Sequence, residues 1–167
     1  LKAKITESLK ECDILLCSGG TSAGVGANIR QILDEIGTVY IHGITVQPGK
    51  PTSLGVVDGK IVIGLPGNPV SAIVIFNVFV APSIKKLAGF VDEQPHKTIK
   101  GKLARRIHSP IGRMQYQLVR VEDGIVYPIF KDSGAIFSLA SAAGYTKVSK
   151  QTEMVEEGEE VEVTLFN

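Results

Sequence analysis

The spacing of apolar residues in the first half of the chain alternates between the helical period and the strand period. Leu1, Ile5 and Leu9 recur every four residues, as on one face of a helix. Short apolar runs follow the helical stretches, as expected for strands. The pattern predicts helices over 1–11 and 28–35 and strands over 13–18, 39–46, 53–57 and 60–64. Helices that alternate with strands in this way are typical of an α/β domain.

Glycine and proline residues mark the ends of these elements. Asp58-Gly59 is a typical two-residue hairpin turn. Asn68 and Pro69 are typical of the N-cap and the first residue of a helix, which we expect to reach about Leu87 and to be kinked or split at Pro82. Because the first part of this helix is apolar almost all round, we expect it to be buried and not to span a membrane.

From about residue 95 the apolar period changes from helical to two. Three stretches place apolar residues at alternate positions, Ile99 to Ile107, Met114 to Leu118 and Val161 to Leu165, and Glu122-Asp123-Gly124 is typical of a turn between strands. We therefore expect two domains, an α/β domain over 1–90 and a small β-rich domain over 95–167.

Composition and charge narrow the possible functions. The chain has 167 residues and a net charge of +1, which gives no general attraction to nucleic acid or to a membrane. Seven basic residues cluster in 95–120 and six glutamates in 151–167, and we expect these two solvated faces to neutralise each other. Cys12 and Cys17 form no CxxC pair, which favours reduced thiols in an intracellular protein.

Three loops that follow predicted strands carry residues suited to an anion. The loop Ser18 to Gly24 combines glycines, which let a ligand approach the backbone, with hydroxyl groups. Lys50 lies between two prolines, and Asn68 would offer a donor at the start of a helix. Since such loops gather at one edge of an open α/β sheet, they favour a pocket for a phosphate-bearing ligand, although plain turns would show the same glycines and prolines.

Other motifs fit less well. Gly19 and Gly24 have the spacing of a Walker A loop, but Val25 stands where that motif needs lysine, and a GxGxxG pattern is absent from the sequence. Gly20 to Gly24 matches the G-x-S-x-G nucleophile elbow, so a serine hydrolase that uses Ser22 is a remote alternative. Its acid would be Asp58 or Asp92 and its base His96 or His108.

Taken together, the three loops closely resemble the signature loops of the MoeA family, the molybdopterin molybdenumtransferases related to the E domain of gephyrin. The matching residues are Ser18-Gly19-Gly20-Thr21-Ser22-x-Gly24, Gln47-Pro48-Gly49-Lys50-Pro51 and Gly64-Leu65-Pro66-Gly67-Asn68-Pro69-Val70-Ser71. Their order and spacing match, and the region from Ser133-Gly134 to the closing strand is similar to the C-terminal β domain of the family. The resemblance covers nearly all of the chain.

This resemblance implies an N-terminally incomplete MogA-like molybdopterin-binding α/β domain over 1–90 and a small β-barrel domain over 95–167. It implies insertion of molybdate into adenylylated molybdopterin with release of AMP, by a homodimer and with Mg²⁺. Lys50, which would pair with phosphate or molybdate, is the implied catalytic residue. The implied cofactor-binding residues are Ser18, Gly19, Gly20, Thr21, Ser22, Gly24, Pro48, Gly49, Lys50, Pro66, Gly67, Asn68, Pro69, Ser71 and Arg113.

The chain departs from the family pattern in two respects. The family usually carries aspartate three residues after Gly24, where this chain has Ala27, and the change removes a natural partner for Mg²⁺. The large N-terminal domains of full-length members are also missing, so we expect a C-terminal part of a longer protein that has no insertase activity alone. A non-catalytic pterin-binding or scaffold module is the alternative. We expect a cytoplasmic protein with no nucleic-acid or membrane partner.

Overall fold

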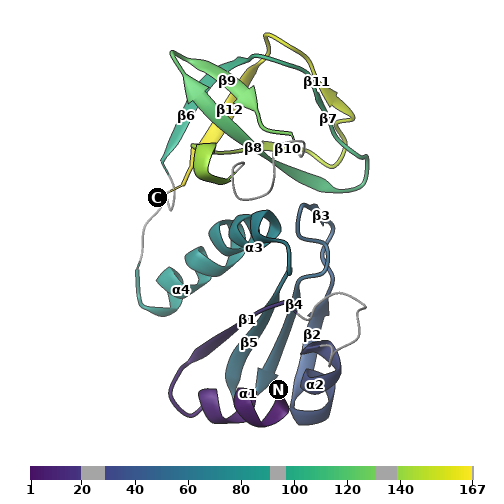
Figure 1. Cartoon of the computed structure of the whole chain (residues 1–167), viewed down its shortest axis with the longest axis vertical. Helices are drawn as coiled ribbons and strands as arrows, with labels where there is room; N and C mark the ends of the chain where they lie inside the picture. Colours follow the sequence, from purple (N-terminus) through teal and green to yellow (C-terminus); the bar gives the residue numbers. More distant parts are fainter. Residues whose placement is uncertain (20–28, 91–96, 131–138, 167) are drawn as a thin grey trace. The chain divides into compact units, whose positions relative to one another are not determined.

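The fold is known from a computed structural model, which describes residues 1–19, 29–90, 97–130 and 139–166. The chain divides into two compact units (Figure 1). The α/β unit consists of Leu1–Ile44 and Gly49–Ile75, and the barrel unit consists of Thr45–Pro48 and Phe76–Asn167. The fold is therefore an α/β domain combined with a small β-barrel, as the sequence predicts.

The α/β unit is built on a four-stranded sheet with the order β1-β5-β4-β2. Its elements are α1 (Lys2–Ser8), β1 (Ile14–Ser18), α2 (Ile29–Ile36), β2 (Thr38–His42), β4 (Ser53–Val57), β5 (Lys60–Leu65) and α3 (Pro69–Ile75). β1 pairs parallel to β5, whereas β4 pairs antiparallel to both β5 and β2. β1, β5 and β2 therefore run in one direction, and their carboxyl ends lie at the same edge of the sheet.

The antiparallel pair β4–β5 follows from the hairpin that the sequence predicts. Asp58 and Gly59 both have positive φ, 49° and 78°, as the two central residues of a type I′ turn require. Such a two-residue turn can join only antiparallel strands. The predicted hairpin is confirmed, and it makes the sheet mixed.

The predicted strand over 39–46 is divided in the structure. β2 ends at His42, and β3 (Val46–Gln47) pairs with β8 within the barrel unit. Gly43 has φ 79°, in the left-handed region that an extended strand does not use. This glycine therefore ends β2, a break that the β-rich composition of the segment does not reveal.

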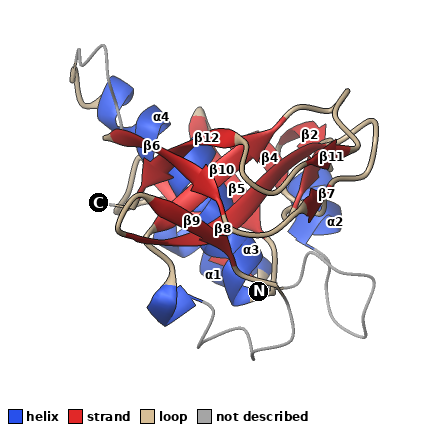
Figure 2. Ribbon diagram, turned by 90° about the horizontal axis from the view of Figure 1, so that it is seen from above, coloured by secondary structure: helices blue, strands red, loops and turns tan. Residues whose placement is uncertain are grey.

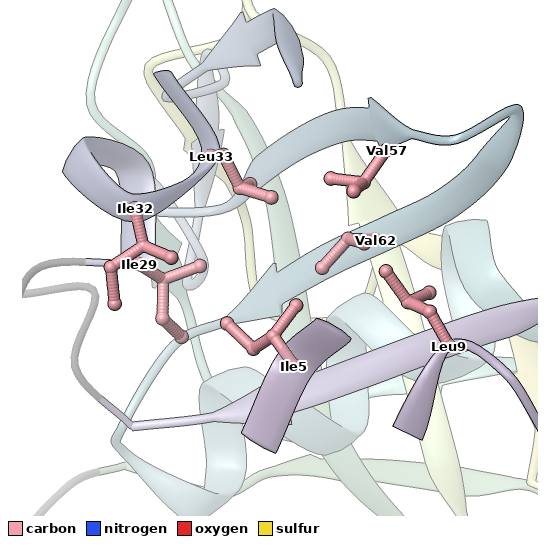
Figure 3. Packing of buried hydrophobic residues seen from close by; sticks show 7 residues of the cluster. All are labelled: Ile5, Leu9, Ile29, Ile32, Leu33, Val57 and Val62. Carbon is pink, nitrogen blue, oxygen red and sulfur yellow. The ribbon is translucent and has the colours of Figure 1, made fainter. Parts of the chain in front are cut away.

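The core of the α/β unit lies between the sheet and helices α1 and α2 (Figure 3). Its buried members are Ile5, Leu9, Ile29, Ile32, Leu33, Val57 and Val62. The helical ones are spaced by three or four residues, which places them on one face of each helix. Complete burial of a leucine, isoleucine or valine side chain contributes about 1.5–3 kcal/mol. The apolar spacing that predicts the two helices is thus the spacing that builds the core.

One helical run extends over Pro69–Leu87 and contains the predicted irregularity. α3 is followed by a π-helical turn, η1 (Phe76–Val80), and then by α4 (Ala81–Leu87), which has Pro82 in its first turn. Proline has no N–H with which to continue the helical hydrogen bonds, so the wider π turn just before it is where the run adjusts. The run is therefore irregular just before Pro82, but it continues without a break to Leu87.

The same run is less buried than its composition predicts. Val74, Ile75 and Val80 are buried, but Ile73, Phe76, Phe79 and Ile84 are each more than a third exposed. By length and composition alone, its 19 residues with mean hydropathy 1.6 would suffice to cross a membrane. The prediction of a buried helix is therefore wrong for one side of the run, because apolar composition does not show whether a partner element is present.

The barrel unit is mostly strands (Figure 2). They are β6 (Thr98–Leu103), β7 (Ile107–His108), β8 (Met114–Glu122), β9 (Ile125–Pro128), β10 (Gly144–Val148), β11 (Met154–Val155) and β12 (Glu160–Leu165). The order β10-β12-β6-β9-β8, with a further pairing of β10 to β8, closes five strands into a barrel. Closure leaves no free edge among these five strands. Its core consists of Leu103, Ile107, Val119, Val126, Val148 and Val163.

The two charged stretches of the sequence meet on the surface of the barrel. Lys100 pairs with Glu160 on the neighbouring strand, and Arg106 pairs with Glu156, each at 2.9 Å between nitrogen and oxygen. All four side chains are about half exposed or more, so solvent screens both pairs and each adds little to stability. These two pairs confirm the expectation that basic and acidic faces neutralise each other.

Candidate anion-binding site

The candidate site lies at the edge of the α/β sheet where β1, β5 and β2 end and β4 begins, which we call the carboxyl edge. A row of paired residues crosses the sheet there: Cys17 is opposite Gly64, Gly64 is opposite Ser53, and Ser53 is opposite His42. The loops that continue from this row are the three that the sequence singles out. In α/β sheets, ligands bind in the crevice at this edge.

The loops that follow β1 and β5 lie in contact. Ser18, the last residue of β1, is paired with Leu65, and Gly19 follows with φ 86°, in the left-handed region. A Cβ atom on Gly67 would lie 3.7 Å from the Cα atom of Gly19. Two of the predicted site residues, Gly19 and Gly67, are therefore neighbours although 48 positions separate them in the sequence.

The turn that carries Lys50 is held by hydrogen bonds on both sides. The Thr52 hydroxyl donates to the Gly49 carbonyl at 2.7 Å, and the Thr52 N–H donates to the same oxygen at 3.1 Å. The Ile44 N–H donates to the Lys50 carbonyl at 2.9 Å. The backbone of Lys50 is therefore fixed, whereas its side chain is exposed and forms no ion pair within the described ranges.

Asn68 begins helix α3 as the sequence predicts. Its side-chain Oδ1 accepts the Ser71 N–H at 3.2 Å, the hydrogen bond of an N-cap, and Pro69 is the first helical residue. Since Oδ1 is engaged within the cap, the amide nitrogen is the group left to donate to a ligand. The Ser71 hydroxyl also donates to Asn68 Oδ1, at 3.4 Å. Pro66 is buried, while Gly67 and Asn68 are exposed.

The remaining predicted residues lie elsewhere. Pro48 belongs to the barrel unit and follows Gln47 through a cis peptide bond. Arg113, also in the barrel unit, is exposed and directly precedes Met114, which pairs with Val46 of β3. Gly20, Thr21, Ser22, Gly24 and Ala27 lie outside the described residues.

The hydrolase alternative gains no support. Asp58 lies at the tip of the β4–β5 hairpin, at the end of the sheet opposite the carboxyl edge. His108 is in β7 of the barrel unit, paired with Met154. Ser22, Asp92 and His96 lie outside the described ranges.

The sequence reasoning missed Ser53 and Thr52. The motif identified from the sequence ends at Pro51, yet both residues are buried at the carboxyl edge, with 3% and 7% of their surface exposed. The sequence feature that could have revealed them is a pair of hydroxyl residues directly before the apolar strand residues that begin at Leu54.

Where the carboxyl edge borders the apolar core, at Cys17, little water is present. Burial raises the pKa of the Cys17 thiol above its usual value, since a thiolate would lose its solvation there. Among the residues that the structure describes, three or more His, Cys, Asp or Glu side chains do not gather anywhere as a metal site would require.

Fold and site together define a class: an α/β domain with an anion-binding edge, followed by a small closed barrel. Two family descriptions match the sequence. Residues 1–86 match "Probable molybdopterin binding domain", and residues 100–166 match "MoeA C-terminal region (domain IV)". The chain belongs to the MoeA family, which is a transferase family of molybdenum cofactor biosynthesis.

Individual relatives agree with this assignment. The chain is 33% identical over 166 residues to a molybdopterin biosynthesis protein of Methanocaldococcus jannaschii, covering 99% of this chain and 39% of the relative. It is 33% identical over 107 residues to the molybdopterin molybdenumtransferase of Haemophilus influenzae, covering 64% of this chain and 26% of that protein. The crystal structure of a MoeA protein of Pyrococcus horikoshii superposes with TM-score 0.88 at 37% identity, covering 99% of this chain and 40% of that one. The chain thus spans well under half the length of these relatives.

Proposed function

We propose that the carboxyl edge of the α/β unit binds molybdopterin, or its adenylylated form, through the phosphate groups. The observation that supports this proposal is convergence: the loops after β1 and β5 and the Gly49–Thr52 turn meet at one edge of one sheet. Lys50 offers an exposed ammonium on a fixed backbone, and Asn68 offers an amide N–H. Fixed donors around a single cation suit an oxyanion, because they are already in place before it binds.

In the full-length protein, we infer that this binding serves the insertion of molybdate with release of AMP. Lys50 would hold the phosphate or molybdate group and offset the negative charge that grows on the departing phosphate. We propose a homodimeric, cytoplasmic enzyme as the working form of the longer protein.

The sequence lacks one of the carboxylates that would bind Mg²⁺. A cation of this kind needs oxygen ligands from carboxylates as well as from the substrate. Ala27 stands where the family usually carries aspartate. We therefore assign no step to Mg²⁺.

Substitution of Lys50 tests the proposed binding. A charge-assisted hydrogen bond contributes about 1.5–3 kcal/mol, so Lys50→Ala should weaken the binding of molybdopterin about tenfold or more. Calorimetric titration of the wild type and the variant measures this. Lys86→Ala, which removes an exposed lysine from the last turn of α4, is the matched control and should bind as the wild type does. Equal affinity for all three proteins would remove Lys50 from the site.

Catalysis is tested separately from binding. Ala27, which stands where the family usually carries aspartate, favours a second candidate function, a module that binds the pterin without completing the transfer. We expect no molybdate-dependent AMP release from adenylylated molybdopterin by the present chain, measured by chromatography of the nucleotide. AMP release above the rate without protein would contradict this expectation.

Ala27→Asp in the longer protein distinguishes the two candidate functions. A gain of Mg²⁺-dependent AMP release would indicate an enzyme that has lost its metal ligand. Unchanged binding with no turnover in both forms would indicate a binding module.

A further inference from the structure

Ser53 is a buried hydroxyl residue at the carboxyl edge with no hydrogen-bonding partner. It is the first residue of β4 and is only 3% exposed. Its Oγ has no partner within the described ranges. Most buried polar groups in folded proteins are paired, because an unpaired buried hydroxyl lowers stability. An unpaired group of this kind at a candidate binding edge calls for a functional explanation.

The position of Ser53 in the sheet shows which side its hydroxyl faces. Alternate residues of a strand share a face, so Ser53 lies on the same face as Gly55 and Val57. Val57 belongs to the core beneath α1 and α2. The residue opposite Ser53 on β5 is Gly64, which has no side chain to reach the hydroxyl.

Two other hydroxyl side chains of the edge are engaged in hydrogen bonds. The hydroxyl of Thr52 donates to the Gly49 carbonyl, and the hydroxyl of Ser71 donates to Asn68 Oδ1. Both bonds hold the local backbone. Cys17, which flanks Gly64 on β1, packs against the apolar core. In the described part of this edge, Ser53 therefore carries the buried hydroxyl group that is still free to donate a hydrogen bond.

We propose that the Ser53 hydroxyl is a further ligand-binding group of this site. It donates a hydrogen bond to an oxygen of a tetrahedral oxyanion that Lys50 holds. The proposal rests on the proposed function of the carboxyl edge and adds a residue to it. A phosphate group and molybdate share this chemistry, since both present tetrahedral anionic oxygens. The loss in stability from the unpaired hydroxyl is then recovered when the anion binds.

Two serines provide a matched comparison. Ser109, in the barrel unit, is 4% exposed, and its Oγ also lacks a partner within the described ranges. Ser53→Ala and Ser109→Ala each remove an unpaired buried hydroxyl, so neither should lower the unfolding temperature, and both should raise it by about 2–4 °C. Only Ser53→Ala should alter the binding of an anion.

The experiment measures the affinity for inorganic pyrophosphate and for molybdate by calorimetry, and the unfolding temperature, for the wild type and both variants. Ser53→Ala should weaken binding at least about tenfold for whichever anion the hydroxyl contacts, while Ser109→Ala leaves both affinities unchanged. A loss confined to pyrophosphate assigns Ser53 to phosphate, and one confined to molybdate assigns it to molybdate.

A parallel titration of Lys50→Ala separates this proposal from the proposed function. If Lys50→Ala loses affinity but Ser53→Ala does not, the proposal for Ser53 is wrong and the anion site stands. If the wild type binds neither pyrophosphate nor molybdate, the anion site itself is wrong and the proposal for Ser53 is wrong with it.

Discussion

Thr52 and Asn68 show how single residues prepare the carboxyl edge for a ligand. The Thr52 hydroxyl holds the Gly49 carbonyl, and Asn68 Oδ1 holds the first turn of α3. Both bonds lie within the protein. Each fixes the backbone next to a group that can bind a ligand. The backbone that carries Lys50 and Asn68 therefore has little entropy left to lose on binding.

Cys17 gives the folded state a dependence on pH. Burial raises the pKa of its thiol, so the folded protein keeps this proton at a pH where the unfolded chain has begun to lose it. The stabilisation is fully present below the usual thiol pKa of about 8.5 and is lost as the pH rises through the raised value. We expect the urea midpoint of the wild type to fall above about pH 8.5, and to fall less in Cys17→Ala.

The pH range of that measurement must be limited, because two buried tyrosines also make the stability depend on pH at higher pH. Burial raises the pKa of Tyr116 and of Tyr145, which ordinarily titrate near pH 10. Titration between about pH 8 and 9.5 therefore isolates the thiol. Parallel curves for the wild type and Cys17→Ala would show that Cys17 does not carry the effect.

At the scale of elements, one turn sequence is used twice. Asp58-Gly59 joins β4 to β5, and Asp123-Gly124 joins β8 to β9, with nearly equal φ values of 49° and 78° in the first and 47° and 77° in the second. A Cβ atom on Gly59 or Gly124 would meet nothing within 4 Å. These two positions therefore require glycine because of their backbone conformation and not because neighbouring atoms would crowd a side chain.

Alanine at these glycines tests that reasoning. Gly59→Ala and Gly124→Ala should each lower the free energy of unfolding by about 1–2 kcal/mol, the cost of the left-handed region for a residue with a Cβ atom. Asp58→Asn should change it by less than about 0.5 kcal/mol, because asparagine tolerates positive φ. Chemical denaturation measures all three, and an unchanged midpoint in both alanine variants would refute the conformational explanation.

At the scale of the whole molecule, the sequence predicts the features that depend on a few adjacent residues. It does not predict the features that depend on contacts between distant parts of the chain. The hairpin at Asp58-Gly59 and the cap at Asn68 each depend on a few adjacent residues, and both are confirmed. The helical run is irregular next to Pro82, where the sequence places a kink or split. The exposed side of the run Pro69–Leu87 was missed because periodicity does not identify the covering partner. Ser53 was missed because its burial and lack of a partner arise from pairing across strands.

The account depends most on the claim that one sheet edge, assembled from three distant loops, binds an anion. Backbone amide chemical shifts of the chain, followed by NMR during titration with pyrophosphate, test this claim directly. We predict that the largest changes occur together at Gly19, Lys50, Gly67 and Asn68, with a single common affinity. Changes confined to the barrel strands, or separate affinities for the three loops, would contradict it.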